Sequence, residues 1–184
     1  MDPLETHNGG KASSLIKLRE GGFSIPSFFV CDSSWSEKEI LKKIDKELPE
    51  AHYFAVRSSA ENEDSKDKSF AGHFYSAVGV SKKDVFKEVS NVQLSFGEML
   101  GSVIVQEFIP SDTAGVMFTE VGEIHLVINA IAGLCLPVVN GDACDEYIFD
   151  KKGNLIDKTI PTAKEAKVFK QGKTISQKVS TESL

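Results

Sequence analysis

The sequence has 184 residues, of which 41% are hydrophobic and 26% are charged, and its formal net charge is −6. This composition is typical of a globular protein with a buried core, and the length suits one domain, which can have two lobes. The acidic balance and the lack of a Lys/Arg-rich run argue against a nucleic-acid partner, because such binding requires clustered basic groups. The chain has no apolar signal segment and nothing near the roughly 18 apolar residues of a membrane span. We therefore expect a cytoplasmic protein with no membrane partner.

The apolar spacing along the chain predicts helices and strands that alternate at first and then mostly strands. In chain order these are a helix over 11–19, a strand over 28–30, a helix over 40–48, strands over 53–58 and 72–80, a helix over 85–99, and strands over 102–109, 115–119, 125–130 and 146–149. Ser36 and Glu39 form a capping box before the second helix, and Asp150–Asn154 is typical of a hairpin turn. We therefore expect an α/β (α+β) fold, an α/β lobe followed by a β-rich lobe.

Cysteine spacing predicts neither a disulfide framework nor a zinc site. Cys31, Cys135 and Cys144 are odd in number and contain no C-x-x-C pair, and the four histidines show no ligand spacing. The acidic residues of the loop that follows the 53–58 strand are more typical of a solvated surface than of a metal site. These are Glu61, Glu63, Asp64 and Asp67. No metal site is therefore predicted.

Two segments contain groups that can hold phosphate. In Asn8-Gly9-Gly10-Lys11, glycines allow a close backbone approach, a helix start favours an anion, and Lys11 adds a cation. The alternative is a loop with a solvated lysine, since the segment departs from a Walker A loop. Arg57 ends an apolar strand and can bind phosphate through two parallel hydrogen bonds. The alternative for Arg57 is an ion pair with a local carboxylate.

Two further segments favour a nucleotide site more weakly. Gly72 allows the backbone to pack flat against a ligand, although a β-bulge glycine is the alternative. The apolar strand Val103–Val105 ends in Gln106 and Glu107, followed by apolar residues. An adenine requires such a combination, a polar group for its edge and apolar faces above and below. The alternative is a core strand that runs out to the surface.

Six segments in this order resemble the nucleotide-binding domain of phosphoenolpyruvate synthase and pyruvate phosphate dikinase, which rifampin phosphotransferase shares. They are GGKASSL, IPSFFV, AVRSSAENEDSKDKSFAG, VIVQEFI, AGVMFT and DEYIFD, and the third is the most specific. The similarity runs from about Gly9 to Asp150. It implies an ATP-grasp fold over residues 1–160, with a lobe boundary near 106–110. From its polar and weakly patterned sequence, we expect the C-terminal segment, residues 161–184, to be loosely ordered.

The resemblance also implies ATP as the ligand and assigns roles to particular positions. By this resemblance, Lys11 and Arg57 hold the phosphates, with Ser58 and Ser59 beside them. Gly72 and Ser76 lie in the phosphate pocket. Gln106 lies on the adenine side, and Glu107, Phe108 and Ile109 form the linker between the lobes. No catalytic residue is assigned.

The sequence departs from the family in two places. Where the family has Gly-Leu-Gly-Glu-x-Val-Val, this chain has Gly133-Leu-Cys-Leu-Pro-Val-Val139, without the acidic residue. After Lys158, nothing matches the segment that supplies magnesium ligands and an Arg, nor the phosphohistidine and barrel domains. Magnesium is therefore expected only where a complete site is assembled. The chain is an ATP-binding domain that is catalytically incomplete by itself, a degenerate binding or regulatory module, or one half of a split enzyme completed by a second polypeptide.

Overall fold

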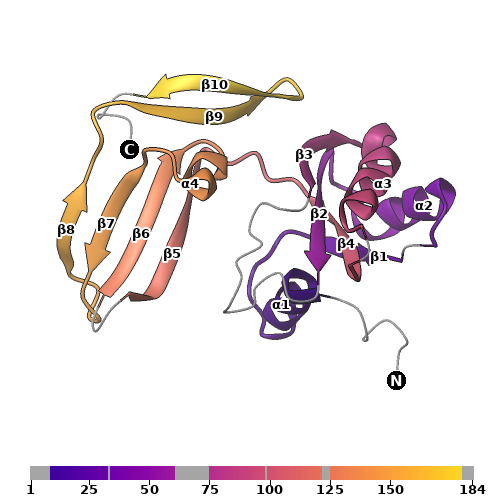
Figure 1. Ribbon diagram of the computed structural model, residues 1–184, viewed down its shortest axis with the longest axis horizontal. Coiled ribbons are helices and arrows are strands. Elements are labelled where there is room, and N and C mark those ends of the chain that lie inside the picture. The colour runs from indigo at the N-terminus through magenta and orange to yellow at the C-terminus, as the bar shows by residue number, and fades with distance from the viewer. Residues whose placement is uncertain (1–8, 33, 61–74, 98, 122–124, 180–184) are drawn as a thin grey trace. The chain divides into compact units, whose positions relative to one another are not determined.

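The computed structural model describes residues 9–32, 34–60, 75–97, 99–121 and 125–179. The chain divides into two compact units, residues 1–109 and residues 110–184. Figure 1 shows that the first unit combines helices with a sheet, whereas the second consists almost entirely of strands. In the described ranges no helix is long and apolar enough to cross a membrane.

The first unit is built on a four-stranded antiparallel sheet with the order β1-β4-β2-β3. Its strands are β1 (Phe28–Cys31), β2 (Tyr53–Ala60), β3 (Ser76–Ser81) and β4 (Gly101–Glu107). The central strands β2 and β4 are almost continuously buried, because the sheet is covered on both faces. This explains their apolar runs in the sequence.

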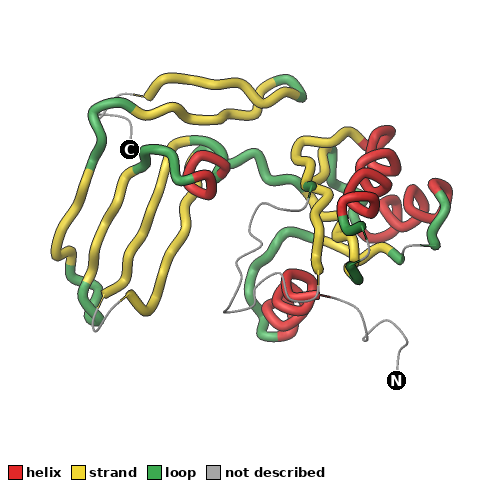
Figure 2. Tube along the Cα trace, viewed as in Figure 1, coloured by secondary structure: helices red, strands yellow, loops and turns green. Residues whose placement is uncertain are grey.

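One face of this sheet carries the main core, which α2 (Glu37–Glu47) and α3 (Val85–Ser95) cover. Phe54 and Val56 of β2 pack there against Ile40 of α2 and Val89 of α3. The other face carries a smaller cluster, in which Ala12, Phe28 and Ile104 are buried. Ala12 belongs to α1 (Gly9–Glu20), so α1 lies on the opposite side of the sheet from α2 and α3 (Figure 2).

The helix starts and ends follow local chemistry. Glu39 accepts hydrogen bonds from the backbone N–H and the Oγ of Ser36, at 2.8 and 2.6 Å, which confirms the predicted capping box of α2. The helix predicted over 85–99 was too long, since α3 ends at Ser95. The chain turns at Gly97, whose φ of +58° is incompatible with a continuing right-handed helix. A short 3₁₀ helix, Lys82–Asp84, precedes α3.

The second unit contains a four-stranded antiparallel sheet and a separate two-stranded hairpin. The elements are β5 (Thr113–Val121), β6 (His125–Ala132), α4 (Leu136–Asn140), β7 (Asp145–Phe149), β8 (Leu155–Thr159), β9 (Lys164–Lys170) and β10 (Lys173–Val179). Asp150 accepts hydrogen bonds from the backbone N–H groups of Lys152 and Asn154, both at 2.8 Å, which confirms the predicted turn between β7 and β8. The hairpin of β9 and β10 occupies a segment whose polar sequence shows little strand pattern.

A buried ion pair joins the hairpin to the larger sheet. Lys164 of β9 contacts Asp145 of β7, and each side chain is only 1% exposed. The other carboxylate oxygen of Asp145, Oδ2, has no hydrogen-bond partner in the described structure.

The protein is a mixed α+β protein with three antiparallel sheets, and no parallel strand pair occurs in the described residues.

Candidate nucleotide site

The pairing of β2 with β4 places three polar side chains on one face of the first sheet. Side chains alternate between faces along a strand, and directly opposite residues of an antiparallel pair share a face. Arg57 lies opposite Ile104, which packs against Ala12 of α1. Ser59, two residues after Arg57, and Gln106, two residues after Ile104, therefore also lie on the face that α1 covers.

The start of α1 is held directly on this face. The backbone N–H of Ala12 donates a buried hydrogen bond to Ser59 Oγ at 2.9 Å. Gly9 has φ of +60°, and a Cβ at this position would lie 2.2 Å from the carbonyl oxygen of Ser59. Glycine is therefore required at residue 9 by close packing against β2. Lys11, next to Ala12, is half-buried at this same end of α1.

The Arg57 side chain extends along the face toward Gln106. Arg57 Nη1 donates to Gln106 Oε1 at 3.5 Å, a long hydrogen bond. Gln106 is only 8% exposed, whereas Arg57 is half-buried. Ser76 of β3 lies opposite Arg57 in the next strand pair and is exposed. Five of the predicted site residues are thus on one side of the sheet, namely Lys11, Arg57, Ser59, Ser76 and Gln106.

The same alternation places two predicted site residues on the other face. Ser58 is 1% exposed and lies between Val56 and Ala60 in sequence, both of which belong to the main core. Glu107 lies two residues after Val105 on β4, so it is on the same face as Val105, which also belongs to that core. Their side chains are not brought together with Arg57. The strand period of two indicates that Ser59, rather than Ser58, accompanies Arg57.

The remaining predicted residues lie at the end of the first unit or outside the described residues. The backbone N–H of Phe108 donates to the carbonyl of Tyr53 at 3.0 Å, so it is held beside β2. Ile109 is 50% exposed and is the last residue of the first unit. Gly72 lies outside the described residues, as do the acidic residues of the loop after β2.

Magnesium does not fit the side chains that the structure describes. In those parts of the chain, no group of three or more His, Cys, Asp or Glu side chains is placed to hold a metal ion. The cationic and amide groups of this face suit an anion, because Arg and Lys provide donors to phosphate oxygens. The arrangement can therefore hold a phosphorylated ligand through these groups.

Comparison with known proteins identifies relatives of this chain. The family described as pyruvate phosphate dikinase, AMP/ATP-binding domain, matches residues 36–99, which include Arg57 and Ser76 but not Lys11 or Gln106. A probable phosphoenolpyruvate synthase of Archaeoglobus fulgidus is 30% identical over 78% of this chain and 22% of the relative. One of Staphylothermus marinus is 35% identical over 75% of this chain and 19% of the relative. An uncharacterized phosphotransferase, YvkC, of Bacillus subtilis is 26% identical over 96% of this chain and 27% of the relative.

Residues 36–99 thus match an AMP/ATP-binding domain of the pyruvate phosphate dikinase family, and that domain is ATP-grasp-like. The chain as a whole is a distant homologue of the N-terminal part of phosphoenolpyruvate synthases. It spans about a fifth to a quarter of the length of these curated relatives.

Proposed function

We propose that this chain binds ATP on the face of the first sheet that α1 covers. The observation that carries the proposal is the alignment of Arg57, Ser59 and Gln106 on that face, with the start of α1 bonded to Ser59. A strand-borne Arg can bind phosphate bidentately, and a helix N-terminus favours negative charge. The family match supports a nucleotide rather than another anion.

Each predicted residue has a role in this proposal. Lys11 and Arg57 contact the phosphates, with Ser76 and Gly72 beside them. Gln106 lies on the adenine side, and Glu107–Ile109 links two lobes of an ATP-grasp fold. Residues 1–160 form this fold, with the lobe boundary near 106–110, which coincides with the division into two compact units. Ser58 contributes through the backbone of β2 only, because its side chain is buried in the main core.

The same proposal includes catalytic incompleteness. Phosphoryl transfer depends on positioning and on metal ions that neutralise the phosphates, and the described residues contain no group of three or more His, Cys, Asp or Glu side chains placed to hold such an ion. The isolated chain is therefore not expected to make phosphoenolpyruvate from pyruvate and ATP. A labelling assay with radioactive ATP, magnesium and pyruvate tests this. Stoichiometric phosphohistidine, or product above the no-enzyme control, would overturn the proposed incompleteness.

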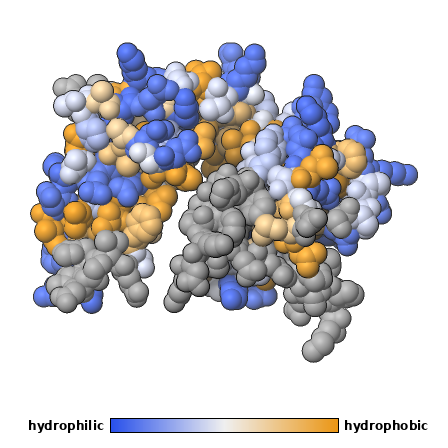
Figure 3. Space-filling model, viewed as in Figure 1, coloured by the Kyte–Doolittle hydropathy of each residue, from blue (hydrophilic) through white to orange (hydrophobic). Residues whose placement is uncertain are grey.

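A second candidate function is one half of a split enzyme, completed by a second polypeptide. The β5–β8 sheet favours it. Met117 and Phe118, adjacent on β5 and thus on opposite faces, are 56% and 49% exposed, and Leu155 and Ile156 of β8 are 51% and 53% exposed. Figure 3 shows apolar side chains gathered over this sheet on the visible side. A sheet with apolar residues on both faces requires a covering layer.

Calorimetry of the chain with ATP, with and without magnesium, tests nucleotide binding. We expect a dissociation constant in the micromolar to millimolar range, about −4 to −8 kcal/mol, because part of the family's phosphate and metal contacts is missing. Arg57→Ala should weaken or abolish binding, whereas Lys87→Ala removes the same charge from an exposed position of α3, on the other side of the sheet, and should leave it unchanged. No binding at millimolar nucleotide would contradict the proposal and favour a degenerate module.

A further inference from the structure

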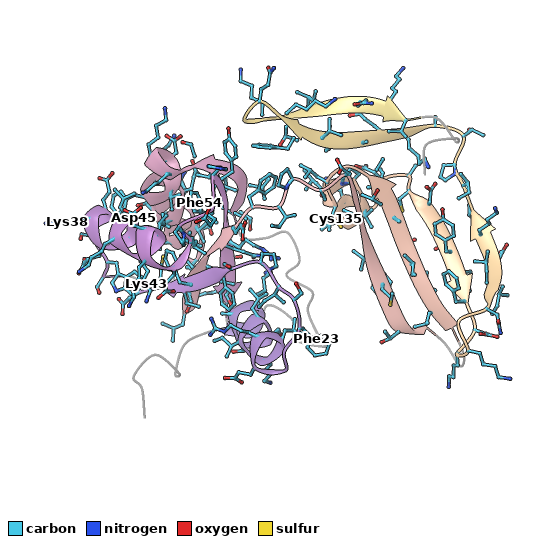
Figure 4. The ribbon with its side chains drawn as sticks, turned by 180° about the vertical axis from the view of Figure 1, so that it is seen from behind. Phe23, Lys38, Lys43, Asp45, Phe54 and Cys135 are labelled. Carbon is cyan, nitrogen blue, oxygen red and sulfur yellow. The ribbon has the colours of Figure 1, made fainter. Side chains whose placement is uncertain are left out.

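A cavity lies along α2, on the side of the first sheet that α2 and α3 cover. It has a volume of about 310 Å³ and is lined by Trp35, Glu39, Lys42, Lys43 and Lys46. The four α2 residues are spaced i, i+3, i+4 and i+7, so they share one face of the helix. Figure 4 shows that the labelled Lys43 and Lys38 project from this helix. We call this cavity the Trp35 pocket.

The aromatic wall of the Trp35 pocket is held in place. Trp35 packs against the main core, and its ring centroid lies 6.2 Å from that of Phe29. Its backbone N–H donates to the carbonyl of Asp32 at 3.2 Å. Lys43 Nζ lies over the Trp35 ring, 5.7 Å from its centre, so a base that stacks there takes the place of this side chain. A half-buried ring that is fixed in this way provides a stacking surface without first having to be ordered.

The pocket has an excess of positive charge that the described residues do not compensate. Lys43 is paired with Glu47, and the Glu39 carboxylate keeps its charge in its hydrogen bonds to Ser36. Lys42 and Lys46 therefore leave the lining one positive charge in excess. Lys42 and Lys46 have no hydrogen-bond or ion-pair partner in the described structure. They lie one helical turn apart, about 6 Å along the axis, on the rim of the pocket. Two lysines at this spacing can contact different oxygens of one phosphorylated ligand.

We propose that the Trp35 pocket binds a nucleoside phosphate, with its base stacked on Trp35 and its phosphates at Lys42 and Lys46. A ligand with both a planar ring and a negative group uses both features of the pocket, because bases stack on aromatic side chains and lysines bind phosphate. The pocket is distinct from the candidate nucleotide site. Trp35 belongs to the side of the sheet with α2 and α3, whereas Arg57 and Gln106 face α1. The proposal therefore does not rest on the proposed function.

Trp35 is the single tryptophan of the chain, so its fluorescence reports this pocket directly. The chain is titrated with ADP, with excitation at the red edge of tryptophan absorption, where the nucleotide absorbs little. We expect saturable quenching by ADP, and weaker quenching by adenosine, which lacks phosphate, or by pyrophosphate, which lacks the ring. Lys42→Gln with Lys46→Gln should weaken ADP binding about tenfold, equivalent to about 1.4 kcal/mol. Both lysines are exposed, so circular dichroism should confirm an unchanged fold.

The matched control is Lys38→Gln with Lys83→Gln, which removes the same charge from exposed lysines outside the pocket. It should leave the quenching curve unchanged. Quenching should also persist in Arg57→Ala, and this separates the Trp35 pocket from the candidate nucleotide site. The proposal is overturned if ADP gives no saturable quenching, or if both double variants weaken it equally. It is also overturned if Arg57→Ala abolishes quenching, or if polyglutamate quenches while ADP does not, since the surface then binds an acidic polypeptide.

Discussion

The backbone N–H of Ala12 donates a hydrogen bond to Ser59 Oγ at 2.9 Å, and this bond joins the first turn of α1 to β2 across 47 residues of sequence. The first four N–H groups of a helix have no partner within the helix, and Ser59 supplies one for Ala12. Both residues are fully buried. The bond therefore fixes where the start of α1, including Lys11, lies relative to Arg57 on the same strand face.

Ser59→Ala should destabilise the first unit by about 1–3 kcal/mol, because it leaves the buried N–H of Ala12 unsatisfied. Urea unfolding followed by Trp35 fluorescence measures this, since the only tryptophan lies in the first unit. Ser14→Ala on the exposed side of α1 is the control and should change stability by no more than about 0.5 kcal/mol. Equal stability of the two variants would show that the bond to Ser59 contributes nothing.

Gly9→Ala should lower the free energy of unfolding more than a glycine substitution at a site where an unfavourable φ is the only cost. An added Cβ at Gly9 would lie 2.2 Å from the Ser59 carbonyl oxygen, so the start of α1 would have to move. At Gly22, φ is +75° but nothing lies within 4 Å of an added Cβ. Gly22→Ala should therefore cost about 1 kcal/mol, the price of the left-handed conformation alone. The same fluorescence-detected unfolding should give a clearly larger loss for Gly9→Ala, and a similar loss for both would contradict the close packing.

Arg57→Lys should weaken ATP binding by roughly 1–3 kcal/mol, because a bidentate contact to phosphate becomes a point contact. Arg57→Ala should weaken it further, and both variants should remain folded, since the Arg57 side chain is only half-buried. Calorimetry gives the affinities, with Lys87→Arg on α3, on the other side of the sheet, as the charge-conserving control. If Arg57→Ala unfolds the first unit instead, Arg57 is a structural partner of its neighbours and the binding role fails.

Local sequence patterns predict parts of both units, and the reasons are physical. The capping box at Ser36 and the turn at Asp150 are short-range hydrogen-bond patterns, and both are confirmed. The buried strand β4 is apolar because both faces of its sheet are covered. By contrast, β8 is exposed at every position, so its sequence carries no alternation of apolar and polar residues. The hairpin of β9 and β10 is equally polar, so its strands are recognised only from their pairing in the structure.

Which side chains share a face depends on the exact register, and a motif does not specify it. Arg57-Ser58-Ser59 is a single motif in sequence, yet Ser58 lies in the main core and Ser59 beside α1. Applying the period of two from Arg57 selects Ser59, but this requires that β2 continue as a strand beyond Ser58. The structure extends it to Ala60. The proximity of Arg57 to Gln106 likewise requires the pairing of β2 with β4, which are far apart in sequence.

Breaking the buried pair in the second unit should be strongly destabilising. Lys164→Met leaves the Asp145 carboxylate buried without a cation, at an expected cost of about 3–5 kcal/mol. Asp145→Leu combined with Lys164→Met removes both charges and should recover most of this loss. Hydrogen exchange at the amides of β7 and β9 measures the effect in the second unit alone.

The exposed pair of Lys167 and Glu165, on the same strand β9, provides the matched control. Lys167→Met should change the protection of these amides little, because surface ion pairs contribute at most about 1 kcal/mol. A double variant less stable than Lys164→Met would show that the buried pair is itself net stabilising, contrary to this expectation.

The three thiols should differ in reactivity. Burial, and to a smaller extent the neighbouring Asp32 carboxylate, raise the pKa of the Cys31 thiol to about 12. Thiol reagents react with the thiolate form. At pH 8 only about one part in ten thousand of Cys31 is therefore in that form. Cys135 and Cys144 are half-exposed, and burial raises their pKa values as well, so they should react more slowly than free cysteine.

A disulfide reagent at pH 8 should therefore modify two thiols of the native chain, and the third only after denaturant is added. Because all three thiols are mainly protonated at this pH, each rate should increase as the pH rises toward the pKa of that thiol. In Cys31→Ser, the native count should stay at two and the denatured count should fall from three to two, which assigns the slow thiol. Peptide mapping identifies the modified residues. If Cys31 is labelled in the native protein as fast as Cys135 and Cys144, then β1 opens to solvent on the time scale of the reaction and the burial of Cys31 in the main core does not protect it.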